Sequence, residues 1–395
     1  MNGKDGGSRD NLRKAAGVHA LCPPSSGRGR IRTIDAARGL GILLIVMGHV
    51  LRDGFFRQLL FTFSVPLFFL LSGAVYRYEL PWKNFLRRRA VSLLLPYAAV
   101  SLLSIAVFMR FGKAAGRGLG EAVVHTGAGW NLAGMLYGNS RGGAMKWNEP
   151  LWFLPCLFVA LLVCDLWERL LRRFGRRNLQ AGRCVLVLLS FGAAWIWHRA
   201  AGDWSLPWSA DAAIGMAAFL EMGIIGRAAL PDAGVGRLGQ LRTVCSRGPV
   251  RAVLIMLFFA AAAALSAWNG FAQVRDLNFG RSCGVFMLTS LFGCAGMLLL
   301  AFSVRKNRLL RLFGQKSLFI LLFHKFPVVL FQFAVPGIRT LLRHGRTLPE
   351  LLCAAAVALA VAAGCTGAAL VFEFVFDAVR GRLSRYRQRR SDGCP

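Results

Sequence analysis

Long apolar runs recur along the whole chain, and they constrain its fold more than any other feature. Two of them are AVLIMLFFAAAAALSAW (252–268) and GVFMLTSLFGCAGMLLLAFSV (284–304). Runs of about 17–25 apolar residues are long enough to cross a bilayer as α-helices. Of the 395 residues, 55% are hydrophobic and only 17% are charged, which does not fit a soluble enzyme of this size. The sequence therefore predicts an all-α, polytopic integral membrane helical bundle.

The apolar runs predict about ten transmembrane helices. Connections between them are short, except for the segment 110–150, whose aromatic residues indicate packing against the outer face of the membrane. The expected spans are 34–52, 55–76, 91–109, 151–168, 184–198, 209–226, 250–269, 282–304, 316–335 and 350–376.

The distribution of Lys and Arg residues predicts which loops lie on the cytoplasmic side of the membrane. With the N-terminus in the cytoplasm, 34 of the 49 Lys and Arg residues lie in cytoplasmic segments and 13 in outer loops. Cytoplasmic loops of membrane proteins carry such an excess, so both termini are predicted to be cytoplasmic. Residues 1–30 lack the apolar core of a signal peptide and are expected to form a disordered basic tail. A second basic tail is expected at 380–395, and the membrane domain at 31–379.

The net charge of +31 does not indicate a nucleic-acid partner. The basic residues lie in clusters between apolar runs, as membrane topology requires, and no RNA- or DNA-binding motif accompanies them. The ten cysteines are scattered, mostly within apolar runs, without the spacing of a zinc site. We therefore expect membrane lipids as surroundings, no nucleic acid, no metal and no required disulfide.

The first helix contains three ionisable residues, Asp35, Arg38 and His49. Arg38 and His49 are eleven residues apart, so they differ by about 20° around a helix and lie about 16 Å apart along it. Asp35 precedes Arg38 by three residues, a spacing at which helical side chains meet. Ionisable groups inside a membrane usually mark functional sites, and histidine can move a proton near neutral pH. The alternatives are interfacial anchoring for the first two residues and a neutral packing contact for His49.

The pattern Asp35, Arg38-Gly39, Gly41, Gly48-His49 resembles the membrane acyltransferase family 3, in its fucose 4-O-acetylase-like branch. That family has a basic residue, ten intervening residues and a histidine in its first helix. The resemblance covers about residues 31–335. Further segments that carry it are FTFSVPLFFLLSGAVY (61–76), KNFLRRRAVSLLLPY (83–97), EPLWFLPCLFVALLV (149–163), FLEMGIIGR (219–227) and FGQKSLFILLFH (313–324).

This resemblance implies a transmembrane acyltransferase domain in the cytoplasmic (inner) membrane, acting on a cell-surface carbohydrate or its lipid-linked precursor. It implies acetyl-CoA or another acyl-CoA as co-substrate, with no permanently bound cofactor. His49 would act as general base or carry the acyl group, Arg38 would position the donor, and Asp35 would orient Arg38. The residues do not decide between direct transfer and an acyl-histidine intermediate.

Further candidate residues lie outside the first helix. Three consecutive arginines (Arg87, Arg88 and Arg89), here called the arginine triplet, could bind donor phosphates or simply anchor a helix on the cytoplasmic side. Near the outer end of the fourth span, Glu149 and Trp152 suit sugar hydroxyls and rings, or form part of an interfacial belt. The family resemblance adds a pocket role for His324 and Ser72.

A rival class is a transporter that exports a polysaccharide or a small anion. Ten spans with buried polar groups also fit such a protein. Transporters often have paired repeats with interrupted helices, and no clear internal repeat is found in this sequence. The absence of a repeat in the sequence favours a membrane acyltransferase over a transporter.

Overall fold

A computed structural model describes residues 31–391, apart from 52, 79–80, 120–126, 139–143, 176–178, 201–203, 228–246 and 335–345. Within helices, the side chains of 111–119, 146–147, 332–334 and 381–391 also lie outside the description. The predicted tail at 1–30 and the last four residues therefore fall outside the described part of the chain.

The described residues are helical throughout the bundle, and nine helices are long and apolar enough to cross a membrane. They confirm the all-α polytopic class and nine of the ten predicted spans. The helices are α2 (Arg32–Val50), α3 (Phe55–Ala74), the run α4 (Trp82–Arg89), η1 (Ala90–Leu94) and α5 (Leu95–Leu119), η4 (Lys146–Trp152) with α7 (Phe153–Arg173), α8 (Leu179–Ala200), α9 (Ala210–Gly226), α11 (Gly248–Asn269), α12 (Cys283–Val304) and α17 (Leu348–Ser391).

The predicted ninth span, 316–335, is not one continuous helix. It consists of two short helices, α14 (Ser317–Phe323) and α15 (Lys325–Ala334), that meet at His324. Pro327 explains the interruption, because it has no N–H to donate to the carbonyl four residues earlier and its ring crowds that turn. Lys316, just before α14, forms an ion pair with Glu373 of α17 and so holds the start of α14 against that helix.

The third span starts earlier than predicted, at Trp82 instead of residue 91. A five-residue π-helical segment, η1, separates α4 from α5. Pro96 lies just beyond this segment and removes one backbone donor, which helps to account for the local widening of the helix. Such π-helical turns are frequent near functional sites.

Two pairs of glycines allow helices to cross with their backbones in contact. A Cβ on Gly39 of α2 would lie 1.9 Å from the carbonyl oxygen of Leu310, in α13 (Arg308–Gln315). At the second crossing, a Cβ on Gly223 of α9 would lie 1.9 Å from the carbonyl oxygen of Leu70 in α3. Small residues are the usual means of close helix approach in membranes.

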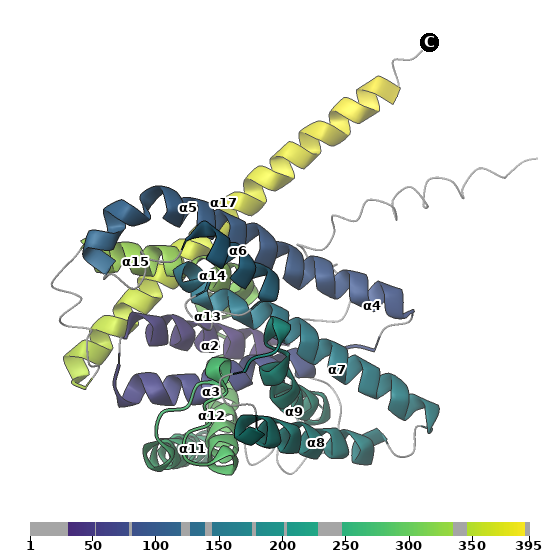
Figure 1. Ribbon diagram of the computed structural model, residues 1–395, viewed down its shortest axis with the longest axis vertical. Helices are drawn as coiled ribbons and strands as arrows, with labels where there is room; N and C mark the ends of the chain where they lie inside the picture. Colours follow the sequence, from purple (N-terminus) through teal and green to yellow (C-terminus); the bar gives the residue numbers. More distant parts are fainter. Residues whose placement is uncertain are drawn as a thin grey trace, which may run out of the picture.

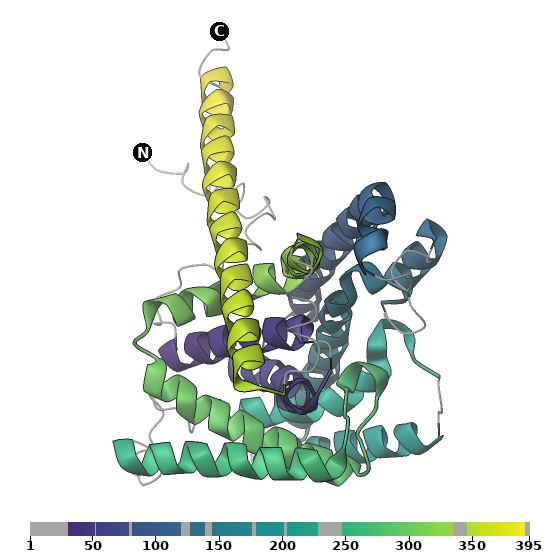
Figure 2. The same ribbon diagram turned by 90° about the vertical axis from the view of Figure 1, so that its left-hand side faces the viewer.

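These crossings place α2 at the centre of the bundle. It packs against α3, α12, α13 and α17, and Figure 1 shows α2 and α3 between α7 on one side and α11 with α12 on another. Figure 2 shows α17 leaving the bundle, with its C-terminal part standing clear of the other helices. The predicted tail from residue 380 therefore begins as a continuation of this helix, through Ser391. We call the bundle side where α2 begins the Arg38 side and the opposite one the His49 side.

Candidate active site

One face of α2 lines two neighbouring cavities inside the bundle. Arg38, Ile42 and Ile45 face the first cavity, and Ile45 and His49 face the second. The sequence-based prediction that Arg38 and His49 share a helix face is thus confirmed. We call these spaces the Arg38 cavity and the His49 cavity.

The Arg38 cavity has a volume of about 170 Å³ and is mostly apolar. Its polar groups are the half-buried Arg38 and the hydroxyls of Ser72 and Ser317. Ser72 donates its hydroxyl hydrogen to the carbonyl oxygen of Phe68 at 2.7 Å, one turn earlier in α3. The structure thus places Ser72 in the same cavity as Arg38. The remaining lining residues are Ile42, Ile45, Phe68, Leu93, Phe153, Leu154, Leu157, Leu318 and Leu321.

The His49 cavity has a volume of about 50 Å³ and is separated from the Arg38 cavity by an apolar waist. Three residues, Ile45, Phe153 and Leu321, line both cavities and form this waist. They come from α2, α7 and α14, so the waist depends on three helices far apart in sequence. The other lining residues of the His49 cavity are His49, Phe61, Val65, Pro150, Trp152, Gln273, Val274 and Arg275.

His49 and His324 lie side by side at the His49 cavity. Their ring centroids are 5.2 Å apart and the ring planes are tilted by 42°. On another flank of His49, the ring of Phe61 approaches edge to face at 5.3 Å. The structure therefore brings His324, from the break between α14 and α15, next to the histidine of the first helix.

A short loop between α11 and α12 closes the His49 side of this cavity. It contains η9 (Val274–Asp276), and Arg275 from it forms ion pairs with Glu149 at 3.1 Å and with Asp276 at 2.9 Å. Burial by itself lowers the pKa of Arg275, but the hydrogen bonds and charges of Asp276 and Glu149 outweigh burial and raise the pKa above its usual value. The loop is thereby tied to the residues that precede α7.

Asp35 and the arginine triplet lie around the Arg38 side. Asp35 accepts a hydrogen bond from Gln315 Nε2 at 3.3 Å, which links the start of α2 to the end of α13. The arginine triplet forms the last turn of α4, and Arg89 precedes the cavity residue Leu93 by four positions. Arg87 and Arg88 are exposed, whereas the Arg89 guanidinium lies over the Phe85 ring, 5.5 Å from its centroid.

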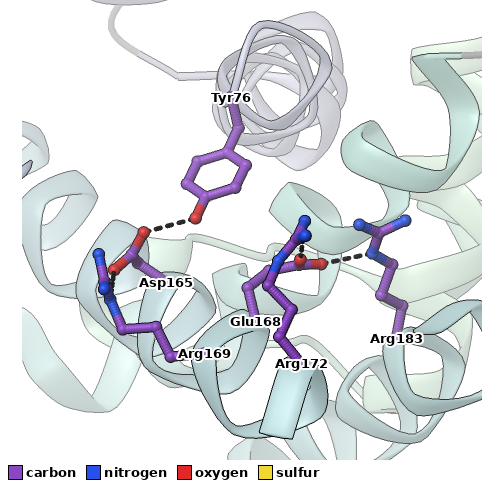
Figure 3. Close-up of polar contacts among 6 residues, drawn as sticks. All are labelled: Tyr76, Asp165, Glu168, Arg169, Arg172 and Arg183. Carbon is purple, nitrogen blue, oxygen red and sulfur yellow. Dashed lines mark hydrogen bonds and ion pairs between the residues drawn. The ribbon is translucent and has the colours of Figure 1, made fainter. Parts of the chain in front are cut away.

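A second group of buried charges lies at the Arg38 end of α7 (Figure 3). Asp165 accepts hydrogen bonds from Tyr76 Oη at 2.5 Å and from Arg169 Nε at 2.7 Å. Burial first, and then the hydrogen bond to Asp165, raise the pKa of Tyr76 above its usual value. Glu168 accepts from both Arg172 and Arg183. We call the set the acid–arginine cluster: Tyr76, Asp165, Glu168, Arg169, Arg172 and Arg183.

The structure divides the predicted site residues between these regions. Trp152 and His49 line the His49 cavity, and His324 lies against His49. Glu149 contacts this cavity through Arg275, and Arg38 and Ser72 line the other cavity.

Sequence reasoning missed three polar residues: Asn148, Gln273 and Arg275. The Nδ2 group of Asn148 donates to the Leu322 carbonyl at 3.0 Å, just before the helix break. Gln273 and Arg275 lie in the loop between α11 and α12, whose basic residues entered the sequence analysis only as part of the charge bias.

These features define a polytopic membrane protein with a pair of histidines at one of two neighbouring internal cavities. The family model described as "Acyltransferase domain" matches residues 31–367, so the chain belongs to this family, acyltransferase 3. The protein is thus a membrane acyltransferase, which acts on an acyl donor and an acceptor. No curated protein and no solved structure matches the chain. The fucose 4-O-acetylase-like branch stays a prediction.

Proposed function

We propose that the protein transfers an acetyl group from acetyl-CoA to a hydroxyl of a cell-surface carbohydrate or its lipid-linked precursor, in the cytoplasmic membrane. The observation that carries this proposal is the pair of neighbouring cavities that share the three waist residues. We assign one substrate to each cavity, and the helix face with Arg38 and His49 lines both. In the proposed reaction, the donor comes from the cytoplasm and the acceptor from the other side of the membrane. A site with one cavity toward each side lets the two substrates meet at the waist.

The Arg38 cavity suits the donor. Its largely apolar lining matches a thin, mostly uncharged pantetheine arm, and Arg38 supplies a fixed positive charge beside it. The arginine triplet lies on the helix that enters this region, where guanidinium groups can bind the phosphates of coenzyme A bidentately. The bias of basic residues assigns this side to the cytoplasm, where acetyl-CoA is made.

The His49 cavity suits a carbohydrate acceptor. The indole ring of Trp152 offers a flat apolar surface for a sugar ring, while Gln273 and Arg275 offer hydrogen-bond groups for its hydroxyls. Glu149 adds a carboxylate through its ion pair with Arg275. An acceptor hydroxyl in this cavity would lie within reach of His49, next to the waist and on its His49 side.

The chemistry follows from this placement. His49 takes the proton of the acceptor hydroxyl while the hydroxyl oxygen attacks the carbonyl carbon of the thioester. The carbon–oxygen bond forms, the carbon–sulfur bond breaks, and the thiolate receives the proton from His49. Direct transfer needs no acyl-histidine, because both substrates reach the waist at once. General-base catalysis of this kind typically contributes about 10²–10⁴-fold in rate.

The test is a transfer assay with the full-length protein in liposomes. Labelled acetyl-CoA is supplied with total surface glycan or its lipid-linked precursors, and released thiol and labelled glycan are both measured. We expect label in the glycan with wild-type protein, and a rate of labelling at least about 100-fold lower with His49→Ala. Equal labelling by both proteins, or labelling by neither, would contradict the proposed function.

The donor site has its own test in the same preparation. Changing all three residues of the arginine triplet to Gln should raise the KM for acetyl-CoA and make it less sensitive to salt, because long-range charge attraction is screened by ions. Orientation in the liposomes is checked first, since these arginines also influence topology. An unchanged KM in correctly oriented protein would leave the triplet with an anchoring role only.

A further inference from the structure

His324 is held in one tautomer by the backbone around it. Its side chain is completely buried, and Nδ1 lies 3.0 Å from the carbonyl oxygen of Ile320 and 2.9 Å from that of Leu321. Carbonyl oxygens only accept hydrogen bonds, so Nδ1 carries the hydrogen. A neutral imidazole has one N–H group, which leaves Nε2 of His324 as an acceptor with a free lone pair.

The local fold fixes the ring in this position. Asn148 donates to the carbonyl oxygen of Leu322, and Pro327 has no N–H for the carbonyl of Phe323. Helix α14 therefore ends where the carbonyls of Ile320 and Leu321 meet the side chain of His324. Turning the ring over would remove the hydrogen bond that Nδ1–H shares between these two carbonyls, in a buried environment where an unpaired polar group costs about 1–3 kcal/mol.

Nε2 of His324 has no hydrogen-bond partner among the described residues. A buried acceptor that is left unpaired needs an explanation, because most such groups in folded proteins are satisfied. The neighbouring polar ring is that of His49, with a centroid separation of 5.2 Å. At this separation, a nitrogen of one ring that points toward a nitrogen of the other comes within hydrogen-bond distance of it.

His49 needs such an acceptor only while it holds a proton. A protonated imidazole has two N–H groups. One hydrogen comes from the acceptor hydroxyl and returns to the thiolate, while the other must be paired inside a low-dielectric interior. Phe61, on another flank of His49, has no acceptor atom to offer. The lone pair of His324 is the complementary group.

We propose that His324 is a positioning residue of the transfer reaction, and that its Nε2 accepts the second N–H of His49 when His49 takes the proton of the acceptor hydroxyl. The inference rests on the proposed function, in which His49 is the general base. Throughout the step, His324 neither gains nor loses a proton. The hydroxyl proton moves to His49 and then to the leaving thiolate, while the His49–His324 hydrogen bond orients the ring and stabilises its charged form.

Two matched substitutions separate the ends of the His324 ring. The amide nitrogen of Asn reaches roughly to Nδ1, so His324→Asn keeps the hydrogen bonds to the backbone carbonyls and removes the acceptor at Nε2. The longer Gln reaches roughly to Nε2, so His324→Gln places an amide oxygen there. The measurements are kcat and both KM values in the liposome assay, with the folded amount determined by gel filtration and thermal unfolding.

We expect His324→Asn to fold like the wild type and to lose roughly 10- to 100-fold in kcat, the size of a lost hydrogen bond to a charged group, with KM values little changed. His324→Gln should recover a substantial part of this loss. Wild-type kcat in His324→Asn would overturn the inference. So would a raised acceptor KM with unchanged kcat, because it would place Nε2 on the acceptor and not on His49.

A double substitution covers the case in which either variant folds poorly. If His324 acts through His49, then adding His324→Asn to His49→Ala causes no further loss of activity per folded molecule. Additive losses overturn the inference and leave His324 an independent role. The proposed function fails separately, if the wild type transfers no acetyl group or if His49→Ala retains full activity.

Discussion

The two ends of α7 handle buried polar groups in opposite ways. At its Arg38 end, all four carboxylate oxygens of Asp165 and Glu168 accept a hydrogen bond within the acid–arginine cluster. At its other end, Trp152 and Phe153 face a cavity beside His324, whose Nε2 has no hydrogen-bond partner in the part of the chain that the structure describes. Helix α7 thus runs from a cluster in which every carboxylate oxygen accepts a hydrogen bond to a region in which Nε2 of His324 can still accept one.

The difference indicates what each region contributes. A satisfied network of buried charges rigidifies the protein, and removing one member leaves the others unpaired. An unpaired acceptor lowers stability and is kept where it can act on a reacting group. We therefore expect substitutions in the acid–arginine cluster to change folding, and substitutions of the histidine pair to change catalysis.

The largest expected effect is on catalysis. His49→Ala should lower kcat by about 10²–10⁴-fold without reducing the folded amount, because a general base is removed and a cavity-lining residue is shortened. His49→Gln is the control, since it keeps a polar side chain that cannot take the proton, and it should be equally inactive. If His49→Gln transfers the acetyl group normally and His49→Ala reduces the folded amount, His49 is a packing residue. The contrast between a structural and a catalytic end of α7 then no longer holds.

The second effect is on stability. Glu168→Ala leaves Arg172 and Arg183 without their carboxylate and should destabilise the protein by about 3 kcal/mol, as breaking a buried ion pair does. Activity per folded molecule should stay close to that of the wild type. Glu373→Ala, which removes the half-exposed partner of Lys316, should cost no more than about 1 kcal/mol. Thermal unfolding in detergent compares the two variants.

The third prediction uses the two glycine crossings. Gly314→Ala places a Cβ 1.8 Å from the carbonyl oxygen of Asp35, and Gly223→Ala places one 1.9 Å from that of Leu70. Each should cost about 1–3 kcal/mol, because helix backbones must separate. Only Gly314→Ala should also raise the KM for acetyl-CoA, since it displaces α13 from the Arg38 part of α2. The same KM change in both variants would mean that the crossings do not differ in function.

The smallest effect is expected at the loop over the His49 cavity. Arg275→Gln breaks the partly exposed ion pair with Glu149, and should raise the KM for the acceptor by at most about fivefold. The KM for acetyl-CoA should not change, because the donor uses the other cavity. A change confined to the donor KM would show that the two cavities have been assigned to the wrong substrates. Steady-state kinetics with each substrate varied in turn gives the answer.

Local patterns in the sequence were enough for nine spans and for the face shared by Arg38 and His49. Helical periodicity relates residues a few turns apart, so it could predict this face without any tertiary information. The break at His324 had a local signal in Pro327, yet the apolar run around it looked continuous. Its effect on the helix depends on the Asn148 side chain that bonds the backbone just before the break.

Contacts between distant segments could not be predicted. His49 and His324 are separated by most of the chain, and only the packing of α14 against α2 brings their rings together. Asp165 and Glu168 lie near the end of an apolar helix, and the sequence analysis did not single them out. Their burial depends on Tyr76 and Arg183 from other helices. Periodicity carries no information on such partners.

The apolar waist of Ile45, Phe153 and Leu321 has a consequence for the membrane itself. A cell that stores energy as an ion gradient cannot tolerate a continuous file of water through one of its proteins. Water retreats from narrow apolar constrictions, so three bulky side chains between the cavities act as electrical insulation. The acyl group is then the only part of the donor that has to pass these three side chains. Their size therefore limits how large an acyl group the protein can transfer without opening a water-filled path for ions through the membrane.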